Sequence, residues 1–133
     1  MASQLKVDTI TGLTPAGSIA VTGEGNSTTT NLQQGLAKIW CNADQTGTVR
    51  DSLNISGITD GGTGDVTFTF SNATSNDDYA LTGSCRRAST TTEAFVFAIH
   101  TMATASCRAR HMYLGQTAYD HDHMCMNIQG DLA

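Results

Sequence analysis

Apolar and polar residues alternate in several short runs of this chain, and the clearest run is residues 66–70. Val66, Phe68 and Phe70 fall on one side of an extended backbone, and threonines fall on the other side. This period of two is typical of a half-buried antiparallel strand. The preceding segment, residues 60–65, reads Asp-Gly-Gly-Thr-Gly-Asp and supplies the positive-φ positions that a chain reversal needs. The runs on either side of it are therefore predicted to form a hairpin.

Similar runs recur along the chain at a spacing of roughly eight to fourteen residues, with turn-forming residues between them. One run carries the only tryptophan, Trp40, and another, residues 93–100, is apolar on both faces and is expected to be a central, doubly covered strand. The pattern predicts an all-β fold, a small antiparallel β-sandwich of about seven strands, over residues 36–133. Its predicted core residues are Trp40, Val66, Phe68, Phe70, Phe95, Phe97 and Ile99.

Residues 1–35 differ from the rest because they hold too few large apolar side chains to close a core of their own. Alternation in residues 5–8 and 19–21 favours an extended N-terminal arm that is ordered by a partner chain, over a flexible tail. The apolar residues expected to contact that partner are Leu5, Val7, Ile10, Leu13, Ile19 and Val21.

The end of this arm has a different period. Leu32, Leu36 and Ile39 have helical spacing, and Thr30 or Asn31 could cap a helical turn before the Trp40 strand. We expect one or two helical turns here. If three chains associate, these three apolar residues are the predicted oligomer contact.

The balance of charge argues against a nucleic-acid partner, because 12 acidic and 7 basic residues give a net charge of −5 and no basic stripe. No apolar run approaches the roughly 20 residues that span a bilayer, and the N-terminus lacks a signal peptide's apolar segment. The chain is therefore expected to be made and assembled in a cytoplasm, without a membrane partner. In that reducing compartment the cysteines (Cys41, Cys85, Cys107 and Cys125) are expected to be free thiols that serve as small core residues.

Metal-ligand residue types concentrate in residues 119–126. On a strand, His121, His123 and Cys125 would project from one face, and these are ligand types that bind Zn²⁺ or Fe²⁺. Three such strands around a threefold axis would bring six imidazoles to one octahedral ion, two from each copy. We expect instead that these histidines decorate an exposed strand and that the protein has no cofactor, and an iron or zinc site at His121 and His123 is the alternative.

Other polar residues favour structural roles. His100 is expected in the core or an interface, and His111 on a solvated strand face, with an anionic surface site as its alternative. Asp60 and Asp65 could hold Ca²⁺, but the alternating ligands and terminal glutamate of a calcium loop are missing, so a turn is expected. Sequence templates for a nucleophile elbow, a phosphate loop and a dinucleotide fingerprint are also missing, which predicts a protein that is not an enzyme.

Several segments resemble structural proteins of tailed phages, especially phages of aquatic bacteria. The matching segments are residues 37–42 (AKIWCN), 47–60 (GTVRDSLNISGITD), 62–70 (GTGDVTFTF), 78–80 (DYA) and the entry segment 5–10. The resemblance covers most of residues 5–85 and implies a virion part, annotated in such phages as fibre-like, tail or capsid-surface. Tips of some phage spikes bind iron through a motif similar to residues 121–123, although those tips are narrow needles.

The resulting hypothesis is a trimeric protein of the virion surface, assembled in the bacterial host cytoplasm. Its expected partners are further copies of itself and the major capsid protein or a tail protein, because symmetric assembly supplies burial that a small sandwich lacks. A chain of 133 residues leaves no room for both a shaft and a receptor-binding tip, which favours a capsid-decoration (cement) protein held by its arm. The alternative is a tail fibre or spike component, or a receptor- or carbohydrate-binding tip, for which 6% aromatic residues are few.

Overall fold

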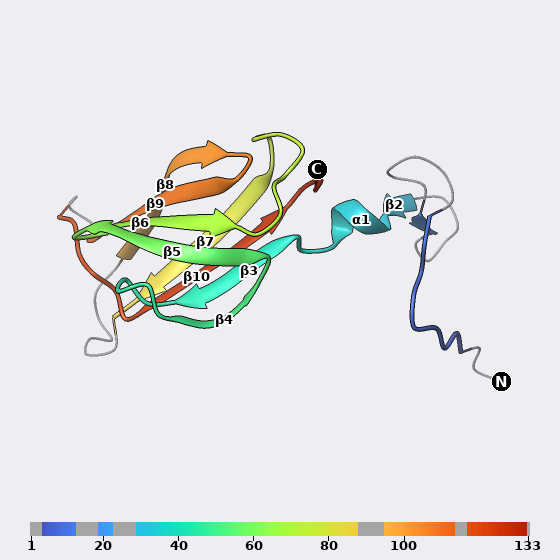
Figure 1. Ribbon diagram of the computed structural model, residues 1–133, viewed down its shortest axis with the longest axis horizontal. Helices are drawn as coiled ribbons and strands as arrows, with labels where there is room; N and C mark the ends of the chain where they lie inside the picture. The colour runs from blue at the N-terminus through green and yellow to red at the C-terminus, as the bar shows by residue number, and fades with distance from the viewer. Residues whose placement is uncertain (1–3, 13–18, 23–28, 88–94, 114–116, 133) are drawn as a thin grey trace. The chain divides into compact units, whose positions relative to one another are not determined.

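The computed structural model describes residues 4–12, 19–22, 29–87, 95–113 and 117–132. Contacts within the chain divide it into two units, Met1–Leu36 and Ala37–Ala133, which are described one at a time (Figure 1). The fold is all-β and every sheet is antiparallel, as the alternation predicts. No helix among the described residues is long and apolar enough to cross a membrane.

The larger unit is a β-sandwich of two four-stranded sheets (Figure 1). The first sheet has the order β4 (Val49–Leu53), β3 (Ile39–Ala43), β10 (His123–Gln129), β7 (Ala80–Arg86). The second sheet has the order β5 (Ile55–Gly62), β6 (Asp65–Phe70), β9 (Ser106–Tyr113), β8 (Phe95–Ala103). The predicted hairpin is confirmed as β5–β6, and Gly62 and Gly64 in its turn have φ of 109° and 67°, where a Cβ atom is disfavoured.

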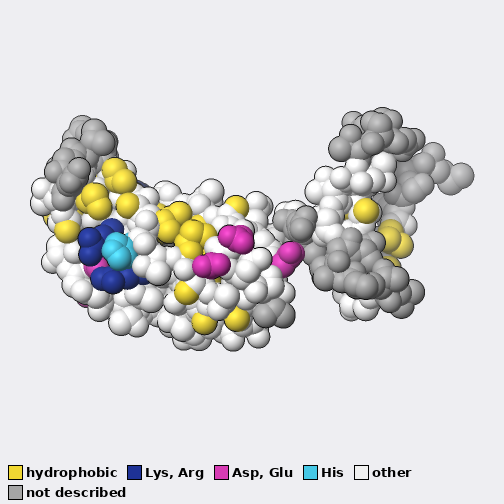
Figure 2. All heavy atoms as spheres, turned by 90° about the horizontal axis from the view of Figure 1, so that it is seen from above, with side chains coloured by type: hydrophobic (Ala, Val, Ile, Leu, Met, Phe, Trp, Pro, Cys, Tyr) yellow, Lys and Arg dark blue, Asp and Glu magenta, His cyan; other side chains and the backbone are white. Residues whose placement is uncertain are grey.

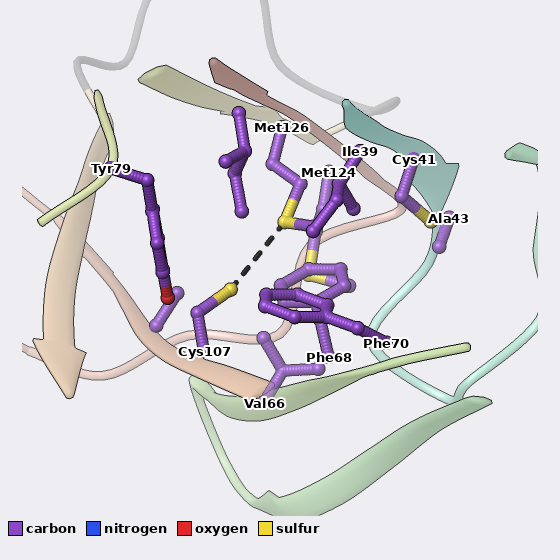
Figure 3. Close-up of a cluster of buried hydrophobic side chains, with 12 residues drawn as sticks. Ile39, Cys41, Ala43, Val66, Phe68, Phe70, Tyr79, Cys107, Met124 and Met126 are labelled. Atoms are coloured by element: carbon purple, nitrogen blue, oxygen red, sulfur yellow. Dashed lines mark hydrogen bonds between the residues drawn. The ribbon is translucent and has the colours of Figure 1, made fainter. Parts of the chain in front are cut away.

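The core lies between the two sheets, where the inward side chains of their central strands meet (Figure 3). The buried apolar residues are Ile39, Cys41, Ala43, Val66, Phe68, Phe70, Tyr79, Cys107, Ala109, Met124, Met126 and Ile128. The predicted core positions Val66, Phe68 and Phe70 are thus confirmed. The Cys107 thiol lies 3.6 Å from the Met126 sulfur, and burial raises the pKa of Cys107 to about 12. The four cysteines are free thiols, of which Cys41 and Cys107 are buried and Cys125 is exposed.

Strand β3 corrects two predictions. Ile39, Cys41 and Ala43 point into the core, so Trp40 lies half-buried on the outer face of the first sheet rather than in the core. The helical spacing that linked Ile39 to the oligomer contact does not persist, because α1 (Leu32–Gly35) ends before it. Ile39 instead follows the period of its strand and is fully buried within its own subunit.

Strand β8 corrects another prediction, because it is an edge strand of the second sheet rather than a central one. A β-bulge between Ile99 and Thr101 shifts its register against β9, and an edge strand has a neighbour on one side only. Ile99 is therefore 44% exposed, while Phe97 is half-buried and packs on the core. His100 is exposed rather than buried, with its Nδ1 2.9 Å from the Thr101 hydroxyl.

The smaller unit has little regular structure. Residues 4–12 form neither helix nor strand, β1 (Ala20–Thr22) pairs with β2 (Thr29–Asn31), and α1 follows as a single helical turn. Four of its predicted partner-contacting residues, Leu5, Val7, Ile10 and Val21, are exposed, and Ile19 is half-buried. Leu13 lies outside the described residues.

We expect Gly64→Ala to destabilise the fold by about 3 kcal/mol or more, because the added Cβ would overlap the His111 carbonyl oxygen and lie 2.8 Å from the Tyr119 nitrogen. Backbone atoms cannot move aside as side chains do. Gly57→Ala is the matched control, since nothing lies within 4 Å of its new methyl group, and it should change stability by less than about 1 kcal/mol. Urea unfolding measures both values, and equal stability of the two variants would contradict the packing around Gly64.

Candidate functional site

Two histidines are buried side by side at one end of the sandwich. On β9 the inward positions are Cys107, Ala109 and His111, so the strand period turns the His111 ring into the protein, where it is 0% exposed. His121 lies two residues before β10 and is 1% exposed. Their ring centroids are 5.5 Å apart, with the rings almost perpendicular. This pair is the most unusual chemical feature of the described residues.

The pair corrects two sequence-based expectations. His111 was expected on a solvated face, but it shares the apolar face of β9 with Cys107 and Ala109. His121 and His123 do not share a face, because the chain bends at Asp122 and β10 begins only at His123. The side chain of His123 is half-buried, whereas that of His121 is enclosed.

A buried glutamine orients His111. The Gln45 Nε2 donates to the carbonyl oxygen of Asp65 at 3.0 Å, and the Gln45 Oε1 lies 3.0 Å from His111 Nδ1. Because the amide nitrogen faces a carbonyl, Oε1 must be the acceptor, and we assign the His111 proton to Nδ1. The Nε2 atom of His111 then carries an unshared electron pair.

Aromatic rings enclose both imidazoles. The Phe97 ring centroid lies 5.0 Å from that of His111, and the Phe95 ring meets His121 edge-to-face at 4.6 Å. Tyr119 packs against His121 from another side, with its ring centroid at 5.6 Å. The Arg87 guanidinium lies 4.5 Å above the Tyr119 ring and donates to the Tyr113 hydroxyl at 3.0 Å. These rings bring apolar surface, and few hydrogen-bonding groups, to the histidines.

Three of the four imidazole nitrogens make no hydrogen bond within the described part of the chain: His111 Nε2, His121 Nδ1 and His121 Nε2. A buried polar atom without a partner costs about 1–3 kcal/mol, so native proteins keep few of them. Burial is the main reason that the pKa of His111 falls to about 4, and the neighbouring His121 adds to the fall while Asp65 opposes it. Burial also lowers the pKa of His121, against the opposing effects of the Tyr119 backbone and the Asp120 and Asp122 carboxylates. Both rings are neutral at pH 7.

Within the described part of the chain, this pair has no third metal ligand. Among the described residues, no group of three or more His, Cys, Asp or Glu side chains is placed to hold a metal ion. An iron or zinc site shared by His121 and His123 of three copies stays a prediction, and it would require the His121 ring to leave the interior.

The carboxylates that could have held Ca²⁺ are engaged within the chain. Asp65 makes a two-point ion pair with Arg108 and lies 3.5 Å from Arg110, and the Arg108 hydrogen bond lowers the pKa of Asp65. The Asp60 carboxylate accepts a hydrogen bond of 2.8 Å from the Gly62 amide. The Asp60 carboxylate therefore stabilises the turn, whereas the Asp65 carboxylate links β6 to β9. Figure 2 shows how few charged side chains the visible face of the sandwich carries, with basic side chains gathered beside a histidine at one end.

Comparison of the chain with models of protein families, with curated proteins and with solved structures gives no match. The arguments about function therefore rest on the sequence and on the geometry of this chain.

We expect the free energy of unfolding to fall as pH is lowered from about 6.5 to about 4. An unfolded chain takes up a proton at His111 near pH 6.5, whereas the folded chain takes it up near pH 4, so the unfolded state binds more protons in this window. The expected loss at His111 is about 3 kcal/mol. The paired carboxylate of Asp65 adds its own loss only at lower pH, because its folded pKa lies below the ordinary value of 3.8.

Urea unfolding of the parent protein and of His111→Leu at several pH values tests this expectation. The variant should lose most of the slope between pH 6.5 and 4, and the exposed-histidine control His100→Gln should keep it. An unchanged slope in His111→Leu would contradict the assignment.

We expect Gln45→Ala to destabilise the protein by about 2–4 kcal/mol, because it leaves His111 Nδ1 buried without a partner and removes a side-chain hydrogen bond from the Asp65 carbonyl. The matched control is Gln129→Ala on the exposed face of β10, which should change stability by less than about 0.5 kcal/mol. Thermal and urea unfolding report both values. Similar small losses in the two variants would show that Gln45 does not hold the histidine.

Proposed function

We propose that this chain is a structural component of a tailed-phage virion, a trimeric surface protein that decorates the capsid shell and is attached through its N-terminal unit. The observation that carries the proposal is the exposure of apolar side chains in that unit. Leu5, Val7 and Ile10 are 81%, 53% and 57% exposed. Val21 and Leu36 are also exposed by half or more.

Exposed apolar side chains in an extended segment favour a partner surface. Burying one such side chain contributes about 1.5–3 kcal/mol, and residues 4–12 gain none of this from regular structure of their own. Alternating apolar side chains in residues 5–8 suit addition of a strand to a neighbouring sheet, in which the backbone supplies affinity and alternate side chains supply specificity. A shell of repeated subunits offers such an edge or groove at every copy.

The resemblance to phage structural proteins supports the proposal mainly from residues outside the arm. Residues 37–42, 47–60 and 62–70, which carry most of it, contribute to β3, β4, β5 and β6. These strands form half of the sandwich, so the matching residues are scaffold, and attachment falls to the N-terminal unit. Leu32 and Leu36 remain the proposed contact between copies, and Ile39 is no longer part of it.

We expect a variant that lacks residues 1–30 to fold with the thermal stability of the full chain and to lose binding to phage particles. The reason is that the core residues all lie beyond residue 36, whereas the exposed apolar side chains of the arm lie before residue 30. Co-sedimentation with particles stripped of the native protein measures the binding.

A full-length chain with Leu5→Ser, Val7→Ser and Ile10→Ser is the sharper test, because it keeps the length and backbone of the arm. Its affinity for particles should fall by at least tenfold, which corresponds to the loss of about 1.4 kcal/mol. The control Thr9→Ser changes a polar residue between them and should bind normally. Undiminished binding by the truncated or the triple variant would refute arm-mediated attachment.

A further inference from the structure

The outer face of the first sheet carries an ordered set of polar side chains around the only tryptophan. Strand register places rows of residues across this face, because directly paired residues of neighbouring strands project to the same side. Three of these rows are Leu53–Trp40–Asn127–Thr82, Asp51–Asn42–Cys125–Ser84 and His123–Arg86, and we call their residues the outer face. A fourth row, Ala80–Gln129, lies next to the first.

A groove runs along the outer face between β7 and β10. Its first part has a volume of about 330 Å³ and is lined by residues 82–84 and 125–127. Its second part has a volume of about 290 Å³, shares Ser84 and Cys125 with the first, and ends at Arg86 and His123. Trp40 lies on β3, the strand next to β10. It pairs with Asn127, which lines the groove, and therefore lies beside the groove.

Most polar side chains of the outer face are not used by the fold, although the Asp51 carboxylate accepts a hydrogen bond of 2.9 Å from the Ser52 amide. Those of Thr82, Ser84 and Asn127 make no hydrogen bond within the described part of the chain. On β3, the Asn42 Oδ1 is shielded from solvent and has no hydrogen-bond partner among the described residues. Rotation of the Asn42 side-chain amide would let this oxygen accept a hydrogen bond from a ligand. The fold alone gives no reason to place an indole and these groups together.

We propose that the outer face binds a neutral oligosaccharide in this groove. A sugar ring has an apolar C–H face that packs on an indole, and hydroxyl groups that both donate and accept hydrogen bonds. Amides and hydroxyls match those hydroxyl groups because they too supply donors and acceptors. Trp40 is the stacking platform, and Asn127 and Thr82 in the same row bind the hydroxyl groups of the ring that lies on it.

Charge and apolarity decide between a sugar and other occupants. The outer face holds one acidic residue, Asp51 on β4, and one arginine, Arg86 on β7, so it attracts neither polyanions nor polycations. Only Trp40 and Leu53 in the three rows are large and apolar, whereas the centre of a stable interface between subunits is predominantly apolar. A neutral, hydroxyl-rich ligand fits this surface best.

The test uses the full-length protein on an array of immobilised neutral and acidic oligosaccharides, followed by titration with the soluble form of the best ligand. Trp40 is the only tryptophan, so its fluorescence reports directly on the proposed platform. We expect binding to neutral members and a change in fluorescence that saturates with the ligand.

Variants locate the site. Asn127→Ala should weaken binding by about tenfold without lowering the melting temperature, as expected for the loss of one hydrogen bond. Trp40→Phe keeps an aromatic ring and should bind with reduced affinity, so it remains informative if Trp40→Ala does not fold. Thr67→Ala, on the outer side of the second sheet, is the control and should bind normally.

No binding to any neutral oligosaccharide would overturn the proposal, and so would binding to acidic members alone. Equal affinity of Asn127→Ala and the parent protein would also overturn it, because the ligand would then lie elsewhere. A tryptophan signal that depends on protein concentration, without a sugar, would assign the face to contact between copies instead.

Discussion

The contact between the inward faces of the two sheets is the constraint on which the rest of this structure depends. Phe68 on β6 and Met124 on β10 are fully buried, and in each of these strands the side chains at alternate positions must then point outward. The single choice of which residues face inward therefore also fixes the outer faces. It buries Ile39 and leaves Trp40 at the surface, and it turns His111 inward beside Ala109.

The histidine pair has an energetic cost that the core must offset. Phe68 and its neighbours gain stability from burial, whereas His111 and His121 bring three buried nitrogens without partners. Gln45 offsets part of this cost at one nitrogen and at the same time ties the residues after β3 to the β5–β6 turn. The sandwich is therefore expected to be most stable when both rings are neutral, and to lose stability in acid first at this histidine pair.

Much of the fold could be predicted from the sequence, because alternation is a local signal. The strand of Val66, Phe68 and Phe70, its hairpin and the all-β class follow from it directly. Position within a sheet is not local, which is why β8 was expected to be central, and why Ile99 and His100 were expected to be covered. In β3 the size of the Trp40 side chain favours burial, but the alternation of Ile39, Cys41 and Ala43 assigns the buried side to those three residues.

The candidate site was predictable only in part. Cys107, Ala109 and His111 share one side of β9, so the alternation of this strand is sufficient to predict that His111 points into the core. The approach of His121 and Gln45 could not have been found, because it depends on loops that bring distant parts of the chain together. The exposed apolar residues of the arm were predicted from composition, since a segment with so few of them cannot enclose them.

Attachment of the sandwich to a virion through its N-terminal unit is the central claim of this account. Cryo-electron microscopy of intact particles of the phage proposed to carry the chain tests it most directly. If the proposal is right, we expect sandwich-shaped density repeated in threes on the outside of the capsid shell, with residues 4–12 ordered against a neighbouring subunit. Absence of that density from shell and tail alike, in particles otherwise complete, would contradict it.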